Sequence, residues 1–266
     1  MPDTTAIRLL HWDEAAASRS AVAVTTRHGG VSRAPYDTLN LALHVGDRPA
    51  DVAVNRARAA AAFGVDLETA VFARQVHGAT AAFVDRGDRG RGSTVEDDAV
   101  PDADILVTTS PDVTLAILVA DCVPLALVDP AAGVLAAVHA GWRGTAAGAV
   151  TSALRAMAER GARPERVRAY LGPAVAPERY QVDAVVQHAL ADAVRPADLD
   201  PAVARTDGPD HWRVDLVAAN RQQLLGNGVR PEHIWASGVA TDDETFFSDR
   251  AARPCGRFAL MARLLG

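Results

Sequence analysis

The sequence predicts an α/β protein with mixed sheets packed on each other and helices on the outside. Three near-continuous apolar runs, Val113–Val119, Val123–Val128 and Val134–Val138, are typical of strands buried on both faces. Segments rich in helix formers lie before and after these runs, and no repeat or clear linker divides the chain. We therefore expect a single domain over residues 1–266.

The other elements follow from local patterns. Alternating or continuous apolar stretches predict strands, and good helix formers closed by Gly64, Gly161 or Gly226 predict helices. The polar, Gly-rich residues 87–99 and the Pro-bounded residues 196–209 predict loops. The elements expected, in chain order, are strands 20–26 and 39–47, helix 51–63, strands 71–72 and 79–84, the three central strands, helix 145–160, strand 167–171, helices 178–194 and 214–225, a last short strand 234–237, and a tail 246–265 that is part loop and part helix.

Composition and charge exclude several function classes. The formal net charge is −6 with no dense basic stripe, which argues against a nucleic-acid surface. All 27 basic residues are arginines, so Schiff-base chemistry and a P-loop lysine are excluded. Neither a signal peptide nor an apolar stretch of about 18 residues is present, so we expect a cytoplasmic protein that contacts no membrane.

Three residues have side chains typical of a metal site. His77, Cys122 and His139 each lie beside a Gly, Asp or Pro at the edge of an apolar strand. A thiolate and two imidazoles suit zinc and leave a fourth position for water. Their intervals of 45 and 17 residues are not those of a zinc finger. The spacing therefore leaves open the alternative that Cys122 is a small buried apolar residue and the histidines are structural.

Four further polar residues are candidates for substrate contacts or proton transfer. Arg143 precedes an expected helix start and suits an anion, although it can equally cover Trp142 or pair with an acid. Arg27 opens an Arg-His-Gly-Gly turn whose amides can surround a phosphate or carboxylate, or form an ordinary turn. Asn40 lies in an apolar stretch and needs a hydrogen-bond partner. Asp121 can accept a proton, orient a histidine or cap a turn.

Taken together, these segments resemble one known family. The resemblance rests on motifs in the same order: Thr26-Arg27-His28-Gly29-Gly30-Val31-Ser32, Asn40-Leu41-Ala42-Leu43-His44-Val45-Gly46-Asp47, Gln75-Val76-His77-Gly78, Ala120-Asp121-Cys122-Val123-Pro124, His139-Ala140-Gly141-Trp142-Arg143-Gly144, Gly172-Pro173-Ala174 and Phe246-Phe247-Ser248. The family is the multicopper polyphenol oxidase or laccase-domain family, understood as zinc-containing purine nucleoside phosphorylases. Bacterial members have also been called peptidoglycan editing factors.

The resemblance implies a function and a site. It implies Zn²⁺ bound by His77, Cys122 and His139, phosphorolysis of adenosine, inosine, guanosine and methylthioadenosine, and deamination of adenosine. It implies a layered α/β/β/α fold similar to cytotoxic-necrotizing-factor-like cysteine hydrolases. On this basis we assign a catalytic role to the three ligands and to Asp121. Substrate contacts are assigned to Arg27, Asn40 and Arg143, and a monomer is favoured.

The C-terminal motifs depart from the family pattern. Ala240-Thr241 stands where a Cys-Thr pair is common, Ser248-Asp249-Arg250-Ala251 where Ser-Tyr-Arg-Arg is usual, and Cys255-Gly256-Arg257 where Thr-Gly-Arg is usual. These changes leave the expected metal set intact. They put in doubt the substrate preference and any role of the tail in the pocket.

Three other functions compete with this interpretation. A metal-free cysteine hydrolase would use Cys122 as nucleophile and His139 as base, would act in peptidoglycan precursor editing, and would not need His77. A copper oxidase is disfavoured because the chain has only three Met and no His-X-His pair. A non-enzymatic binding module would require a closed pocket or a fully coordinated metal.

Overall fold

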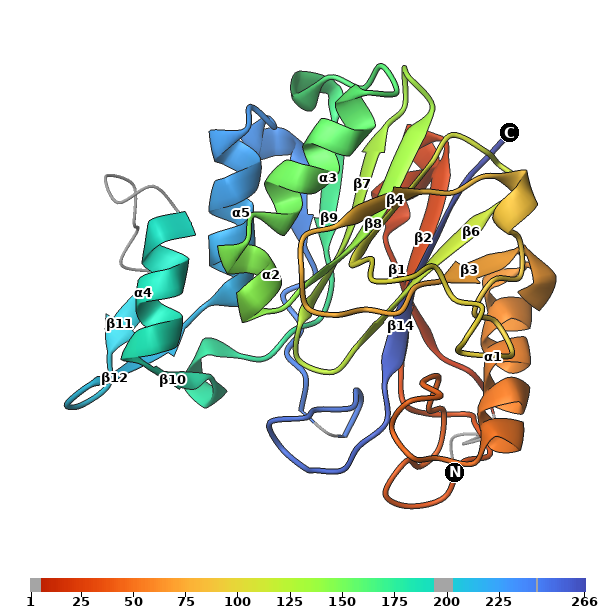
Figure 1. Ribbon diagram of the computed structural model, residues 1–266, viewed down its shortest axis with the longest axis horizontal. Helices are drawn as coiled ribbons and strands as arrows, with labels where there is room; N and C mark the ends of the chain where they lie inside the picture. The colour runs from red at the N-terminus through yellow and green to blue at the C-terminus, as the bar shows by residue number, and fades with distance from the viewer. Residues whose placement is uncertain (1–5, 194–202, 243) are drawn as a thin grey trace.

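Two large β-sheets lie face to face at the centre of the structure, and helices cover their outer faces (Figure 1). The computed structural model describes residues 6–193, 203–242 and 244–266. The five-stranded sheet runs, in spatial order, β1 (Leu9–His11), β2 (Ser20–Thr25), β14 (Phe258–Leu264), β6 (Thr114–Val119) and β3 (Ala70–Phe72). The six-stranded sheet runs β13 (Ile234–Ala236), β9 (Arg168–Leu171), β7 (Val123–Asp129), β8 (Val134–Ala140), β5 (Ile105–Thr108) and β4 (Ala81–Phe83).

A small third sheet and five α-helices complete the described part of the fold. The third sheet has the order β10 (Gln181–Asp183), β12 (His211–Val214) and β11 (Ala204–Thr206). The helices are α1 (Pro49–Phe63), α2 (Trp142–Ala146), α3 (Ala149–Ala158), α4 (Ala184–Ala193) and α5 (Leu216–Gly226). None of the described helices combines the length and apolarity needed to cross a membrane.

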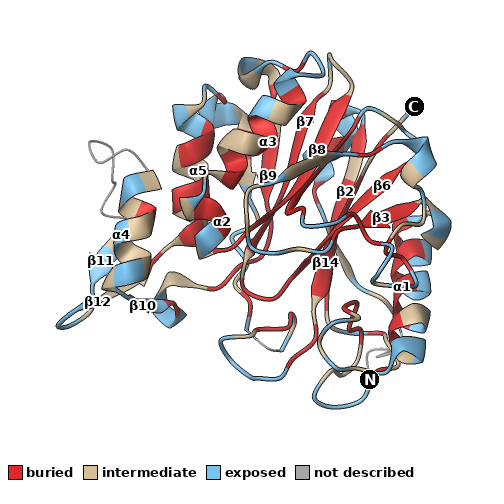
Figure 2. Cartoon of the chain, in the orientation of Figure 1, coloured by how far each residue is buried: buried red, intermediate tan, exposed pale blue. Residues whose placement is uncertain are grey.

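The central strands are apolar on both faces because each face packs against a different layer. In β7, Leu125 and Leu127 pack with α3, whereas Ala126 and Val128 pack against the other sheet. Successive side chains of a strand point to opposite faces, so a strand between two apolar layers has no polar face. The buried strands form the middle of the molecule in Figure 2.

The outer helices complete an α/β/β/α arrangement, which confirms the predicted mixed α/β fold. α1 buries Ala59, Ala60 and Phe63 against the outer face of the five-stranded sheet. α3 and α5 cover the outer face of the six-stranded sheet, on the opposite side of the molecule (Figure 1). The likeness to cytotoxic-necrotizing-factor-like hydrolases stays a prediction.

The largest error of the sequence analysis concerns the tail. Residues 246–265 contain no helix; they hold β14, which pairs with both β2 and β6 in the five-stranded sheet. Its residues Phe258, Leu260 and Ala262 face the other sheet, and Ala259 and Met261 face α1. Ala, Leu and Met are good helix formers, and the packing of this segment between two layers overrides that preference.

Other expected elements also differ from the structure. Residues 39–47 form a loop rather than a strand, because the Asn40 side chain bonds both the backbone N–H and the carbonyl of Ala42. The helix expected over 145–160 is divided by Gly148, whose φ of 76° is left-handed. The helix expected over 178–194 begins only at Ala184, after β10, and its last residue lies outside the described residues. Part of the loop expected over 196–209 lies outside them too.

Five short strands of the described residues were missed, one of them β10, which lies where a helix was expected. They are β1, β5, β10, β11 and β12, each of three or four residues. A strand of this length carries too little apolar periodicity to be separated from a loop by sequence. β5 matters most for function, because Asp104 directly precedes it.

Candidate metal centre

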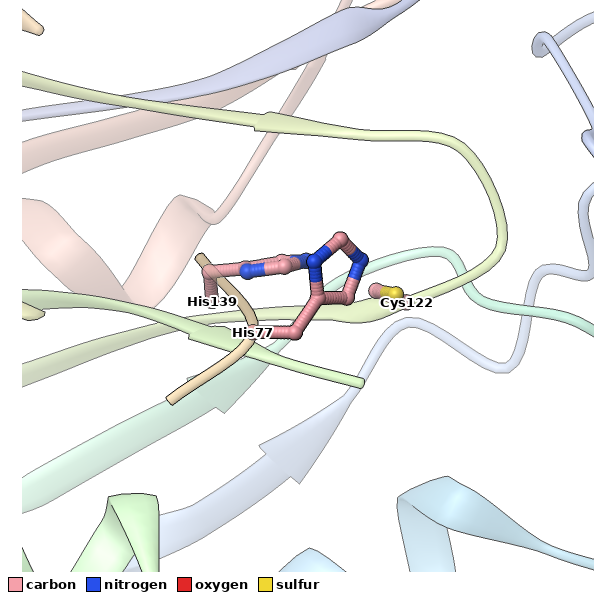
Figure 3. Close-up of side chains that lie close together, drawn as sticks. All are labelled: His77, Cys122 and His139. Atoms are coloured by element: carbon pink, nitrogen blue, oxygen red, sulfur yellow. The ribbon is translucent and has the colours of Figure 1, made fainter. Parts of the chain in front are cut away.

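His77, Cys122 and His139 converge on one point at the edge of the sheets (Figure 3). His139 lies in β8, Cys122 in the turn between β6 and β7, and His77 in the loop after β3. Their ligand atoms all lie within 4.8 Å of one another. A tetrahedral zinc ion with bonds of about 2.0–2.3 Å holds its ligand atoms about 3.5 Å apart, so small side-chain rotations bring this set onto one ion. The group can therefore bind a metal.

Asp104, which no sequence pattern predicted, holds both histidines in place. This fully buried carboxylate accepts a hydrogen bond from Nδ1 of His139 at 2.7 Å. It also accepts the backbone N–H groups of Val76, His77 and Gly78 at 3.2, 2.9 and 2.7 Å. The first bond leaves Nε2 of His139 as the ligand atom, and the others fix the His77 loop, where His77 has a φ of 62°. An acid directly before an apolar strand was the available signal.

The backbone beside the thiol must be glycine. A Cβ added at Gly141 would lie 2.7 Å from Sγ of Cys122 and 3.4 Å from Cδ2 of His77. Gly141 has an ordinary φ of −77°, so this requirement is steric and not conformational. The Gly in His-Ala-Gly-Trp is thus explained by the space that the Cys122 and His77 side chains occupy.

The charges of Cys122 and His139 stabilise each other. Burial raises the pKa of the Cys122 thiol, but the charge and hydrogen bond of His139 and the hydrogen bond of His77 outweigh it and bring the pKa to about 6. Burial lowers the pKa of His139, but the charge of Cys122 and the hydrogen bond to Asp104 raise it to about 9. The metal-free site therefore holds a thiolate, the form of cysteine that binds metals and attacks electrophiles, near neutral pH.

Asp121 organises the C-terminal loop and not a histidine. Its carboxylate accepts hydrogen bonds from Thr241 Oγ1 at 2.5 Å, Ser248 Oγ at 2.8 Å and the Arg250 N–H at 2.6 Å. Asp121 itself has a left-handed φ of 83° next to Cys122. These bonds anchor the C-terminal loop, and Asp104 is the residue that orients His139. A catalytic role for Asp121 stays a prediction.

A cavity of about 400 Å³ opens beside the three side chains. Arg143 lines it, as predicted, and also covers the Trp142 ring at 4.4 Å from the ring centroid. The C-terminal loop adds arginines that the sequence analysis did not assign to the site: Arg250, Arg253 and Arg257. Asp249 pairs with Arg253 at 2.5 Å and with Arg257 at 3.1 Å. Within the described chain, Arg143 and Arg250 have no acidic partner, so they are the guanidinium groups most suited to an anion.

Arg27 and Asn40 do not line this cavity, and their predicted contacts with substrate stay a prediction. Arg27 donates two hydrogen bonds to the Asp37 carbonyl and stacks 4.6 Å from the Phe247 ring centroid. Asn40 is fully buried, and its Oδ1 accepts the backbone N–H of Arg257 at 2.9 Å. In the structure both side chains hold loops around the site.

Comparison with known proteins identifies the family. The family described as multi-copper polyphenol oxidoreductase laccase matches residues 21–264. The chain belongs to this family. Its relative purine nucleoside phosphorylase YlmD of Geobacillus stearothermophilus is 39% identical over 259 residues, which are 95% of this chain and 94% of the relative. Purine nucleoside phosphorylase SCO2081 of Streptomyces coelicolor is 44% identical over 238 residues, 88% and 91% of the two chains.

Solved structures related to this chain share its fold. The crystal structure of Bacillus licheniformis hypothetical protein YfiH matches with a TM-score of 0.91 and 32% identity, covering 99% of this chain and 98% of that one. YlmD from Geobacillus stearothermophilus matches with a TM-score of 0.88 and 38% identity, covering 93% of each chain. The family resemblance expected from the motifs is thereby confirmed, and relatives named as nucleoside-processing enzymes span nearly the whole chain.

Proposed function

We propose that this protein is a zinc-dependent purine nucleoside phosphorylase that cleaves adenosine, inosine, guanosine and methylthioadenosine with phosphate, and that it also deaminates adenosine. The observation that carries the proposal is the convergence of His77, Cys122 and His139 on an arginine-lined cavity. The names of relatives about 40% identical over most of the chain support it. We further propose that the protein acts in the cytoplasm as a monomer and binds neither nucleic acid nor membranes.

The donor set fits zinc. Two imidazoles and one thiolate are typical catalytic zinc ligands. Three protein ligands leave one coordination position for substrate or water. When bound, zinc would supply a Lewis acid that polarises an oxygen of the substrate or of water. Asp104 would keep His139 oriented toward the ion through Nδ1, as carboxylates commonly do for metal-binding histidines.

The arginines supply the phosphate site. Phosphorolysis breaks the N-glycosidic bond while a phosphate oxygen approaches the anomeric carbon, so the dianion must be held against that carbon. Arg143 and Arg250 line the cavity from α2 and from the C-terminal loop, and neither is neutralised by an acid of the described chain. Charge-assisted hydrogen bonds from guanidinium groups bind phosphate and orient it. Asp121 positions one of them, because it accepts the backbone N–H of Arg250.

Replacing each cysteine in turn tests the proposal. Cys122→Ala is expected to lose both zinc and phosphate-dependent release of hypoxanthine from inosine. Cys255→Ala removes the other thiol, which is buried and outside the proposed ligand set, and is expected to keep its zinc. Wild-type inosine turnover by Cys122→Ala would refute the proposal. Deamination is followed separately, as ammonia released from adenosine without phosphate.

A second candidate is a metal-free cysteine hydrolase acting on a peptidoglycan precursor. The arrangement Cys122–His139–Asp104 favours it, because a thiolate, a histidine and a carboxylate that orients the histidine form a nucleophilic triad. His77 separates the two candidates: His77→Ala should abolish zinc-dependent phosphorolysis but spare a thiol hydrolase. A stable covalent adduct on Cys122 during turnover would support the hydrolase.

A further inference from the structure

One tyrosine hydroxyl beside the candidate metal centre has no hydrogen-bond partner among the described residues. Tyr180 lies between the short turn Pro177–Arg179 and β10, is only 8% exposed and lines the cavity. Its hydroxyl makes no hydrogen bond with any described residue. The hydroxyl is not one of the enclosed side-chain atoms that lack a partner, and the residue lines the cavity, so the hydroxyl can be reached from the cavity. This hydroxyl therefore has a free donor for a molecule in the cavity.

The surroundings of Tyr180 place its phenol at the site and not elsewhere in the core. The charges that act on it belong to residues lining the cavity: Cys122, Arg250, Asp121 and Arg143. Burial, reinforced by the negative charge of Cys122, raises the pKa of Tyr180 to about 12, so the phenol remains a neutral donor.

The wall around Tyr180 suits a flat, apolar group. Val175, Tyr180 and Leu216 belong to one apolar cluster, against which Trp142 packs, and all four line the cavity. Arg250 lies 4.9 Å from the centroid of the Tyr180 ring. A purine base has an apolar face that can pack on such a wall and ring nitrogens that accept hydrogen bonds at its edge. Phosphate and ribose, being more polar, fit the arginine and metal-binding side better.

We propose that Tyr180 donates a hydrogen bond from its hydroxyl to N7 of the purine base and stabilises the base as it leaves. The inference rests on the proposed phosphorolysis. In that reaction the C1′–N9 bond breaks with both electrons going to the base, and an oxygen of hydrogen phosphate bonds C1′. The proton of the phosphate ends on the base, and Tyr180 keeps its own. The hydrogen bond strengthens as negative charge develops on the imidazole ring of the purine.

Leaving-group dependence tests this role. Tyr180→Phe removes the hydroxyl and keeps the ring. Tyr170→Phe is the control, because the Tyr170 hydroxyl also has no partner but is enclosed in the core, and Tyr170 lies outside the cavity. We expect Tyr180→Phe to lower kcat/KM for inosine by about 100-fold, as loss of a donor to developing charge does. 7-Methylinosine already carries a positive charge on its base and has no free N7. Tyr180→Phe should therefore cleave it at nearly the rate of the wild-type protein. Equal losses on both substrates, or no loss on inosine, would overturn the proposal.

Binding gives a second measurement that does not depend on turnover. Zinc-loaded protein without phosphate is titrated with inosine and with 7-deazainosine, which lacks the N7 acceptor. We expect wild type and Tyr170→Phe to prefer inosine by about tenfold and Tyr180→Phe to show no preference. Equal binding of the two nucleosides by wild type would overturn the contact. If the preference is found but no nucleoside is cleaved, the contact stands and the phosphorylase proposal fails.

Discussion

Replacing Asp104 with asparagine tests how the metal centre is held together. The carboxylate accepts four hydrogen bonds, from Nδ1 of His139 and from the backbone N–H groups of residues 76–78. Asparagine keeps the size of the side chain but replaces one acceptor oxygen with an NH₂ group, which is itself a donor. Some of the four N–H donors would then face the asparagine NH₂ group, which cannot accept a hydrogen bond. His139 would also lose the negative charge that orients its ring.

The expected effect on metal binding follows from these contacts. Loss of a carboxylate that orients a histidine ligand typically costs about 10- to 100-fold in metal affinity, or about 1.4–2.8 kcal/mol. Here the same substitution also loosens the His77 loop, so we expect the upper half of that range. Stability should fall as well, by about 1–3 kcal/mol for each buried donor left unpaired.

Competition for zinc with a chromophoric chelator measures the affinity, and thermal unfolding of the metal-free protein measures the stability. Asp129→Asn is the matched control. Asp129 is also fully buried and accepts backbone N–H groups, those of Ala131, Ala132 and Arg163, together with the Arg166 guanidinium, but it lies outside the cavity. Asp129→Asn should lower the stability of the protein and leave its zinc affinity unchanged. Wild-type zinc affinity in Asp104→Asn would refute this account of the site.

Three further outcomes are expected. Gly141→Ala should lose zinc, because the new Cβ would lie 2.7 Å from the Cys122 sulfur, whereas Gly226→Ala, with no atom within 4 Å, should bind zinc normally; metal analysis of both proteins decides this. Arg143→Gln should raise KM for phosphate by about tenfold without changing zinc content, and a KM for inosine that rises instead would place Arg143 at the nucleoside. The metal-free protein should be most stable between about pH 6 and 9. The Cys122 contribution to the free energy of unfolding is lost as pH falls through about 6, because the folded pKa of Cys122 lies below the ordinary 9.0. The His139 contribution is lost as pH rises through about 9, because the folded pKa of His139 lies above the ordinary 6.5. Urea titrations across that range that show stability rising steadily in either direction would disprove the pairing.

The sequence predicted those parts of the site in which a His or Cys lies at the edge of an apolar strand. His77, Cys122 and His139 were found in this way, although nothing in their spacing requires them to meet. They meet because the ends of β6 and β8 and the loop after β3 lie at the same edge of two packed sheets. Asp104 was not found, since a single aspartate before a four-residue strand looks like an ordinary turn residue.

Two of the predicted substrate-binding residues lie away from the cavity, and the sequence could not show this. Arg27 and Asn40 are polar residues in short motifs, as binding residues often are, but their partners are the backbone of Asp37 and of Arg257. A residue that shapes a loop around a site and one that touches the substrate have the same appearance in a sequence. The tail escaped prediction because β14 owes its conformation to the strands on either side, and these lie more than 130 residues earlier in the chain.

Titration of the metal-free enzyme with zinc, followed by phosphate-dependent cleavage of inosine, tests the central claim most directly. Activity is expected to be absent without metal, to rise in proportion to added zinc, and to reach its plateau at one zinc per chain. Full phosphate-dependent activity in protein stripped of metal would contradict the claim that His77, Cys122 and His139 act by holding an ion.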